Sequence, residues 1–163
     1  QAVEPPLDLP IEGQLPELNG LTTWLNSSPL TRQQLRGKVV LIDFWTFGCI
    51  NCQRALPHVK AWYEKYKDQG LVVIGVHAPE FAYEHNVDNV RRAAERMGFH
   101  FPIAIDNDFA VWRSFGNQYW PANYFIDAQG RIRFHHFGEG EYEKSERVIR
   151  QLLQEAKSSR ADT

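Results

Sequence analysis

Two cysteines, Cys49 and Cys52, are the residues of this 163-residue chain whose type and spacing could most readily carry out chemistry. They are its only cysteines and form a C-x-x-C motif. Residues 38–45 before them are almost wholly apolar, as is typical of a strand buried on both faces, and apolar residues recur at helical spacing after them. The motif is therefore predicted where a buried strand turns into a helix. Backbone N–H groups and the helix dipole favour an anion there, so the pKa of Cys49 should fall below its ordinary value of about 8.5.

Such a pair could serve redox catalysis, a structural disulfide or part of a zinc site. A structural zinc site needs four ligands, and the sequence has no second C-x-x-C and no histidine pair at the usual spacing, so His58 would be a third ligand at most. A disulfide between residues this close closes too small a loop to stabilise the fold much. We therefore favour redox catalysis. We expect no metal, and no cofactor other than the redox-active Cys49–Cys52 disulfide.

The composition argues against several kinds of partner. The formal net charge is −2 at pH 7, and basic residues are scattered along the chain, so we expect no nucleic-acid partner and no anionic membrane surface. No apolar run approaches the roughly 20 residues that span a bilayer. The chain opens on Gln1, without a signal or anchor segment, as if such a segment had been removed. We expect a monomer from an extracytoplasmic compartment.

The remaining segments predict an α/β domain around the motif. Residues 1–20 are rich in proline and glycine and are expected to form an extended lead-in, whereas residues 21–163 should form a single domain. A strand at 71–76 after the Cys49 helix implies a parallel strand–helix–strand unit. A strand at 101–106 is expected at a sheet edge because it contains Pro102. The other predicted elements are a short strand at 21–26, a helical turn at 31–35, helices at 87–97, 110–115 and 141–157, and a hairpin of 122–127 with 131–137.

The run from Asp43 to Pro57, D-F-W-x-x-x-C-x-x-C-x-x-x-x-P, resembles the active-site segment of thioredoxins. The helix and strand inserted between residues 77 and 106 resemble the TlpA, CcmG and ResA branch of that superfamily. Longer runs are similar to the thioredoxin-like domain of DipZ-type cytochrome c biogenesis proteins, namely W-L-N at 24–26, L-R-G-K-V-V-L-I-D-F-W-T at 35–46, C-I-N-C at 49–52, G-V-H-x-P-E-F at 75–81 and Y-W-P-A at 119–122. The resemblance implies a thioredoxin-like fold, with a central mixed β-sheet flanked by helices.

The reaction predicted for the motif is thiol–disulfide exchange. Cys49, at the exposed helix start, attacks a substrate disulfide, and Cys52, one turn further in, resolves the mixed disulfide. Ile50 and Asn51 between them carry no charge, which favours a reductant over a strong oxidant. By the resemblance, Asp43 is a buried acid that shuttles the proton of Cys52, and burial should raise its pKa.

Other site residues follow from the resemblance and from the loops near the motif. Pro121 resembles the cis-proline that faces the cysteines in thioredoxin folds, and Trp120 before it offers backbone hydrogen bonds and an apolar wall to the substrate. Phe47 and Gly48 are assigned to substrate binding as well. The loop after the second buried strand contributes Glu80 and His77 as candidates for tuning a cysteine pKa, although His77 is better explained as a structural histidine. His135 and His136 alternate faces on their strand and cannot chelate one metal.

The sequence therefore predicts a thiol–disulfide oxidoreductase, a reductase of periplasmic protein disulfides. The resemblance implies a CcdA- or DsbD-like membrane protein as a candidate electron donor. A peroxiredoxin-like thiol peroxidase is an alternative, because Thr46-x-x-Cys49 occurs, but that motif wants a proline at position 42, which is Ile42. A copper-delivery module is the other alternative, and C-x-x-C spacing counts against it.

Overall fold

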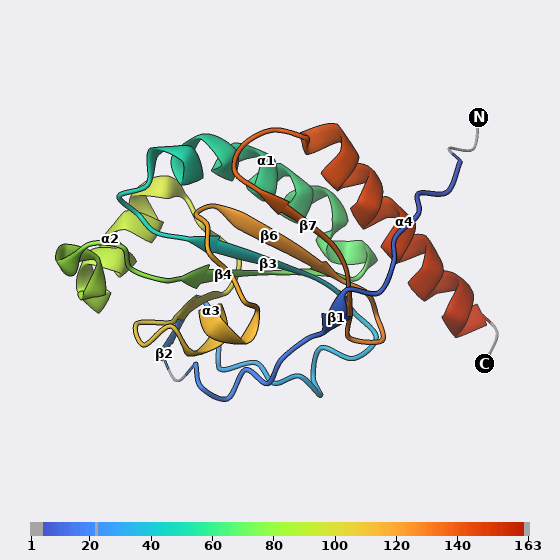
Figure 1. Cartoon of the computed structure of the whole chain (residues 1–163), viewed down its shortest axis with the longest axis horizontal. Coiled ribbons are helices and arrows are strands. Elements are labelled where there is room, and N and C mark those ends of the chain that lie inside the picture. The colour runs from blue at the N-terminus through green and yellow to red at the C-terminus, as the bar shows by residue number, and fades with distance from the viewer. Residues whose placement is uncertain (1–4, 22, 162–163) are drawn as a thin grey trace.

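A mixed sheet forms the centre of the computed structural model, which describes residues 5–21 and 23–161 (Figure 1). Within these residues the sheet has seven strands in the order β1-β7-β6-β3-β4-β5-β2. The strands are β1 (Gly13–Gln14), β2 (Thr23–Leu25), β3 (Val39–Trp45), β4 (Leu71–His77), β5 (Ile103–Ile105), β6 (Ala122–Ile126) and β7 (Arg131–Phe137). The predicted parallel unit is confirmed by β3 and β4, and the predicted hairpin by antiparallel β6 and β7.

Helices cover both faces of this sheet. They are α1 (Ile50–Tyr66), α2 (Val87–Met97), α3 (Ala110–Ser114) and α4 (Tyr142–Ala161), with short 3-10 helices η1 (Lys67–Gln69) and η2 (Ala82–His85). Buried side chains of α1, α2 and α4 share one core cluster with Leu41 and Trp45 of β3. Those of α3, together with Leu15 and Leu18 of the lead-in, share a second cluster with Ile42 and Phe44, on the opposite face. Figure 1 shows α1 and α4 on one side of the strands and α3 on the other.

Strand β3 positions the cysteines. All seven of its residues are buried, because parallel β4 lies on one side, antiparallel β6 on the other, and helices cover both faces. Alternation along the strand places Asp43 on the same face as Leu41 and Trp45, the face that α1 covers. The chain leaves β3 at Trp45 and enters α1 at Ile50, so the motif stands at the strand-to-helix turn, as predicted.

One local expectation was wrong. Strand β5 is not at an edge, because β2 pairs with its outer side. Pro102 lies just before β5, where its missing N–H removes no bond and its carbonyl accepts one from the Gly75 N–H, 2.9 Å away. The helical turn predicted at residues 31–35 corresponds to hydrogen-bonded turns over residues 32–37, in which the Leu35 N–H donates to the Arg32 carbonyl.

The predicted lead-in, of which residues 1–4 lie outside the described residues, contributes to the fold. Its short strand β1 pairs with β7, and Leu15 and Leu18 are 2% and 1% exposed in the second core cluster. None of the helices in the described part of the chain combines the length and apolar character that crossing a bilayer requires.

Candidate active site

Cys49 is the N-cap residue of α1, so its sulfur faces the unpaired N–H groups of the first helical turn. Its Sγ accepts a hydrogen bond from the Cys52 N–H at 3.1 Å. Both cysteines are free thiols, with Cys49 half-buried and Cys52 buried. The more accessible sulfur is therefore the one at the helix N-terminus.

The two sulfurs differ in acidity. The hydrogen bond with the Cys52 side chain, joined by the N–H groups of Cys52 and Asn51, outweighs desolvation and lowers the pKa of Cys49 to about 7. Burial, followed by the hydrogen bond with Cys49 and its charge, raises the pKa of Cys52 far above its ordinary range. Cys49 is thus substantially a thiolate at neutral pH, whereas Cys52 keeps its proton.

Asp43 lies two residues before the end of β3 and is 5% exposed. Burial, with a smaller contribution from the charge of Cys49, raises its pKa from 3.8 to about 8. Its negative charge in turn raises the pKa of Cys52, so the two groups are electrostatically coupled. Its register partner on β6 is Asn123, whose side chain therefore projects from the same face of the sheet.

His77, the last residue of β4, lies beneath the turn before Cys49. It is fully buried, and burial lowers its pKa to about 4, so the ring is neutral at pH 7. Its Nε2 accepts from the Phe47 N–H at 3.3 Å and lies 3.2 Å from the Thr46 hydroxyl. The Phe47 ring stacks on it with centroids 5.7 Å apart. These contacts stabilise the turn at Thr46 and Phe47, and none of them is made to the Cys49 sulfur.

Glu84 of η2 is a site residue that the sequence did not reveal. It is fully buried, and its carboxylate accepts hydrogen bonds from the N–H groups of Gly48, Glu80 and Phe81. Burial raises its pKa, but these bonds and one from the Thr46 hydroxyl prevail and leave it below the ordinary value. Two of these donors, Glu80 and Phe81, are local, but the Gly48 N–H lies 36 residues away in the chain, and nothing in the local sequence indicates that contact.

The predicted substrate-binding residues lie in two places. Phe47 and Gly48 form the turn that leads into Cys49, and the Gly48 N–H is already engaged by Glu84. Trp120 and Pro121 precede β6, and the peptide bond between them is cis. The Trp120 indole N–H donates to the Ala78 carbonyl at 2.8 Å, which ties this loop to the loop after β4.

The other candidates have simpler surroundings. Glu80 is exposed, and its negative charge raises the pKa of Cys49, although less than the other causes do. His135 contacts Glu12 at 2.9 Å, and His136 contacts the Glu139 carbonyl at 3.2 Å, so they do not share a ligand. No group of three or more His, Cys, Asp or Glu side chains suited to a metal occurs among the described residues.

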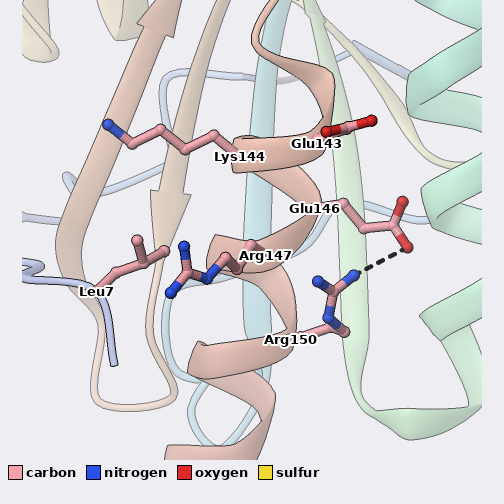
Figure 2. Close-up of a pocket in the computed structure, with 6 residues that line it drawn as sticks. All are labelled: Leu7, Glu143, Lys144, Glu146, Arg147 and Arg150. Carbon is pink, nitrogen blue, oxygen red and sulfur yellow. Dashed lines mark ion pairs between the residues drawn. The ribbon is translucent and has the colours of Figure 1, made fainter. Parts of the chain in front are cut away.

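A hollow on α4 lies apart from the residues of this site. Its volume is about 580 Å³, and its lining is Leu7, Glu143, Lys144, Glu146, Arg147 and Arg150 (Figure 2). Acidic and basic side chains alternate around it, and Glu146 pairs with Arg150 at 3.4 Å. We assign it no role in the chemistry of the cysteines.

Comparison with known proteins places this site in a family. The model of the AhpC/TSA family matches residues 12–135. The chain belongs to the AhpC/TSA family. A relative of similar size is the thiol-disulfide oxidoreductase YkuV of Bacillus subtilis, which is 35% identical over 142 residues, 86% of this chain and 95% of YkuV.

Two further comparisons confirm the predicted branch and fold class. Protein DipZ of Mycobacterium tuberculosis is 54% identical over 148 residues, which are 89% of this chain but 21% of DipZ, so the chain spans about a fifth of that relative. The solution structure of a thioredoxin-like protein in the oxidized form superposes with a TM-score of 0.77 at 35% identity, over 87% of this chain and 96% of the other. The AhpC/TSA domain described here therefore has the thioredoxin-like fold.

Proposed function

We propose that the chain is a thiol–disulfide oxidoreductase that reduces disulfides of extracytoplasmic proteins through Cys49 and Cys52. The observation that carries the proposal is the arrangement at the start of α1: an accessible sulfur with a pKa of about 7, a buried sulfur that keeps its proton, and a buried acid beneath them. Relatives of this class, such as YkuV, bear the name thiol-disulfide oxidoreductase.

The first step uses the acidity of Cys49. Its thiolate attacks one sulfur of the substrate disulfide, the substrate S–S bond breaks, and the departing thiolate takes a proton from solvent. The product is a mixed disulfide between Cys49 and the substrate. Cys52 remains protonated during this step, because burial keeps its pKa high.

The second step requires Cys52 to lose its proton, and Asp43 is suited to receive it. The Cys49 charge raises the pKa of Asp43, so formation of the mixed disulfide removes that charge and makes Asp43 ionise more readily. The carboxylate then takes the Cys52 proton, and the new thiolate attacks the Cys49 sulfur, which breaks the bond between Cys49 and the substrate sulfur. The expelled substrate thiolate takes a proton from solvent. The substrate leaves as a dithiol with two electrons from the enzyme, which is left with a Cys49–Cys52 disulfide for a donor to reduce.

The acidity of the Cys49 thiol supports the proposed direction of electron flow. In a strong oxidant the protein stabilises the thiolate of the attacking cysteine so much that its pKa is about 3.5. The corresponding cysteine of reducing thioredoxins has a pKa of about 7. The value of about 7 for Cys49 supports a reductase. Equilibration with glutathione should give a reduction potential nearer the −270 mV or so of thioredoxin than the −120 mV or so of a strong oxidant.

Thr46 bears on the peroxidase alternative. Its hydroxyl contacts His77 Nε2 at 3.2 Å and donates to Glu84, so it is engaged away from an incoming peroxide. Purified protein should catalyse reduction of insulin by dithiothreitol, and Cys49→Ala should abolish the catalysis. Consumption of hydrogen peroxide without reduction of insulin would overturn the proposal, as would stoichiometric copper binding without reduction.

The extracytoplasmic substrates and a CcdA- or DsbD-like membrane electron donor rest on the likeness to DipZ. The variant Cys52→Ala should trap these partners, because it forms the mixed disulfide but cannot resolve it. Partners released from it by dithiothreitol can be identified by mass spectrometry. Only cytoplasmic proteins among the trapped partners would contradict the location.

A further inference from the structure

One buried carboxylate joins the turn before Cys49 to the segment inserted after β4. Glu84 Oε2 accepts from the Gly48 N–H at 2.9 Å. Its Oε1 accepts from the N–H groups of Glu80 and Phe81, each at 2.8 Å. Gly48 and Glu84 are 36 residues apart in the chain. The contact is therefore tertiary, and both carboxylate oxygens take part in it.

The absence of a side chain at Gly48 is necessary for this contact. A Cβ atom there would lie 2.6 Å from Glu84 Oε2 and 2.5 Å from the Tyr83 hydroxyl, closer than real Cβ atoms approach other atoms. Gly48 is not among the glycines with positive φ, so backbone conformation does not explain why a glycine occupies this position. The glycine next to Cys49 is explained instead by the close approach of η2.

The segment held in this way brings chemically distinct groups toward the sulfur. The charge of Glu80 raises the pKa of Cys49. Tyr83 packs edge-on against Phe47 with centroids 5.5 Å apart, and Phe81 stacks on Tyr83 at 6.1 Å. Phe81 and Tyr83 are 50% and 53% exposed, so they extend a surface beside the Cys49 turn.

We propose that Glu84 is a positioning residue that latches the 80–84 segment to the Gly48 turn and thereby fixes which groups of that segment stand beside Cys49. Glu84 does not itself react. A carboxylate is required because every contact is made by a donor: three backbone N–H groups and the Thr46 hydroxyl. A glutamine offers one accepting oxygen and a donating NH₂ group, so it cannot hold both sides. The latch deepens the proposed function, since it concerns the same sulfur.

A double-mutant cycle tests the latch without any turnover. The pKa of Cys49 is measured from the pH dependence of its alkylation by iodoacetamide, with Cys52→Ala in every variant so that one thiol reacts. Glu80→Gln should lower this pKa by a few tenths of a unit in the parent, and should have no effect when Glu84→Gln is present. An equal effect of Glu80→Gln in both backgrounds would overturn the latch. Absence of insulin reduction by the unsubstituted protein, together with the expected loss of the Glu80→Gln effect in the Glu84→Gln background, would instead count against the proposed function alone.

Controls separate positioning from general stability. Glu95→Gln removes an exposed carboxylate from α2 and should leave the effect of Glu80→Gln unchanged. Gly48→Ala removes the contact between Glu84 and the Gly48 turn without changing a charge. It should therefore abolish the effect of Glu80→Gln on the Cys49 pKa, as Glu84→Gln does. Where Glu84→Gln does not fold, the cycle is run with Gly48→Ala.

Amide hydrogen exchange of the unsubstituted protein gives an independent readout. One carboxylate protects the Gly48, Glu80 and Phe81 N–H groups, so opening of the latch should expose all three together and their protection factors should agree within about threefold. An unprotected Gly48 amide beside strongly protected Glu80 and Phe81 amides would refute the connection between the two segments.

Discussion

Replacement of Asp43 by asparagine should make the protein more stable and less active. The carboxyl group is 5% exposed, and burial raises its pKa from 3.8 to about 8. Between these two values the folded state binds more protons than the unfolded state, so folding stability falls as pH rises from about 4 to about 8. At pH 7 the resulting loss in the free energy of unfolding approaches about 4 kcal/mol. The reason is that pH 7 is about three units above the ordinary pKa of an aspartate, and each unit is worth about 1.4 kcal/mol. Asparagine is of similar shape and carries no charge, so it should escape most of this penalty.

The assay is urea unfolding of the reduced protein at pH 5, 6, 7 and 8, compared with Asp43→Asn. The difference in the free energy of unfolding should grow with pH over this range, to about 2–4 kcal/mol in favour of the variant at pH 7. Asp108→Asn, an exposed control, should change stability by less than about 0.5 kcal/mol. Insulin reduction should slow at least tenfold at pH 7, because the proton acceptor of Cys52 is lost. An Asp43→Asn protein that is less stable than the parent, or equally stable at all four pH values, would refute the reasoning.

Three further outcomes are expected. Cys49→Ala should abolish disulfide exchange, whereas Cys52→Ala should accumulate mixed disulfides on non-reducing gels; full turnover by Cys52→Ala would reverse the assigned roles. Alkylation of Cys49 by iodoacetamide should rise with pH around a midpoint of about 7, and a midpoint above 8.5 would mean that the start of α1 does not stabilise the thiolate. Leu152→Ala should cost about 2–5 kcal/mol, because this α4 side chain is fully buried, whereas the exposed Gln154→Ala should cost less than about 0.5 kcal/mol in the same unfolding assay.

The sequence predicted the elements whose local pattern is strong. Residues 38–45 are apolar apart from Lys38 and Asp43, and residues 71–76 are apolar throughout, as is typical of strands buried on both faces. The strand predicted at residues 101–106 exists, but its place in the sheet was predicted wrongly. Pro102 suggested an edge strand, but the strand begins after the proline, and β2, only three residues long, supplies the pairing on its outer side. Sheet order depends on which distant segment completes an edge, and no local pattern encodes that.

Within the site, the sequence predicted the residues that carry a recognisable local pattern. It did not predict residues whose role depends on hydrogen-bond partners elsewhere in the fold. The spacing of Cys49 and Cys52 and the position of Asp43 in an apolar strand are visible in the sequence. Glu84 lies in a short polar and aromatic stretch where a glutamate is unremarkable, and its importance arises from its contact with the Gly48 N–H, 36 residues away. Gly48 was predicted to bind substrate, which stays a prediction, but its lack of a side chain has a cause that only the packing of η2 shows.

The two buried carboxylates near the dithiol show how the surroundings divide their roles. Burial raises the pKa of both Asp43 and Glu84 as the first effect. Four donors counteract it at Glu84, which therefore stays ionised and holds backbone N–H groups in place. At Asp43 no hydrogen bond lowers the pKa, and the charge of Cys49 raises it further. A carboxyl group whose pKa lies near neutrality can exchange a proton during the reaction, whereas one fixed as an anion cannot do so without releasing its donors. We therefore propose Asp43 for proton transfer and Glu84 for positioning: Asp43 is coupled electrostatically to both cysteines, whereas Glu84 is bonded to the Gly48 turn that precedes them.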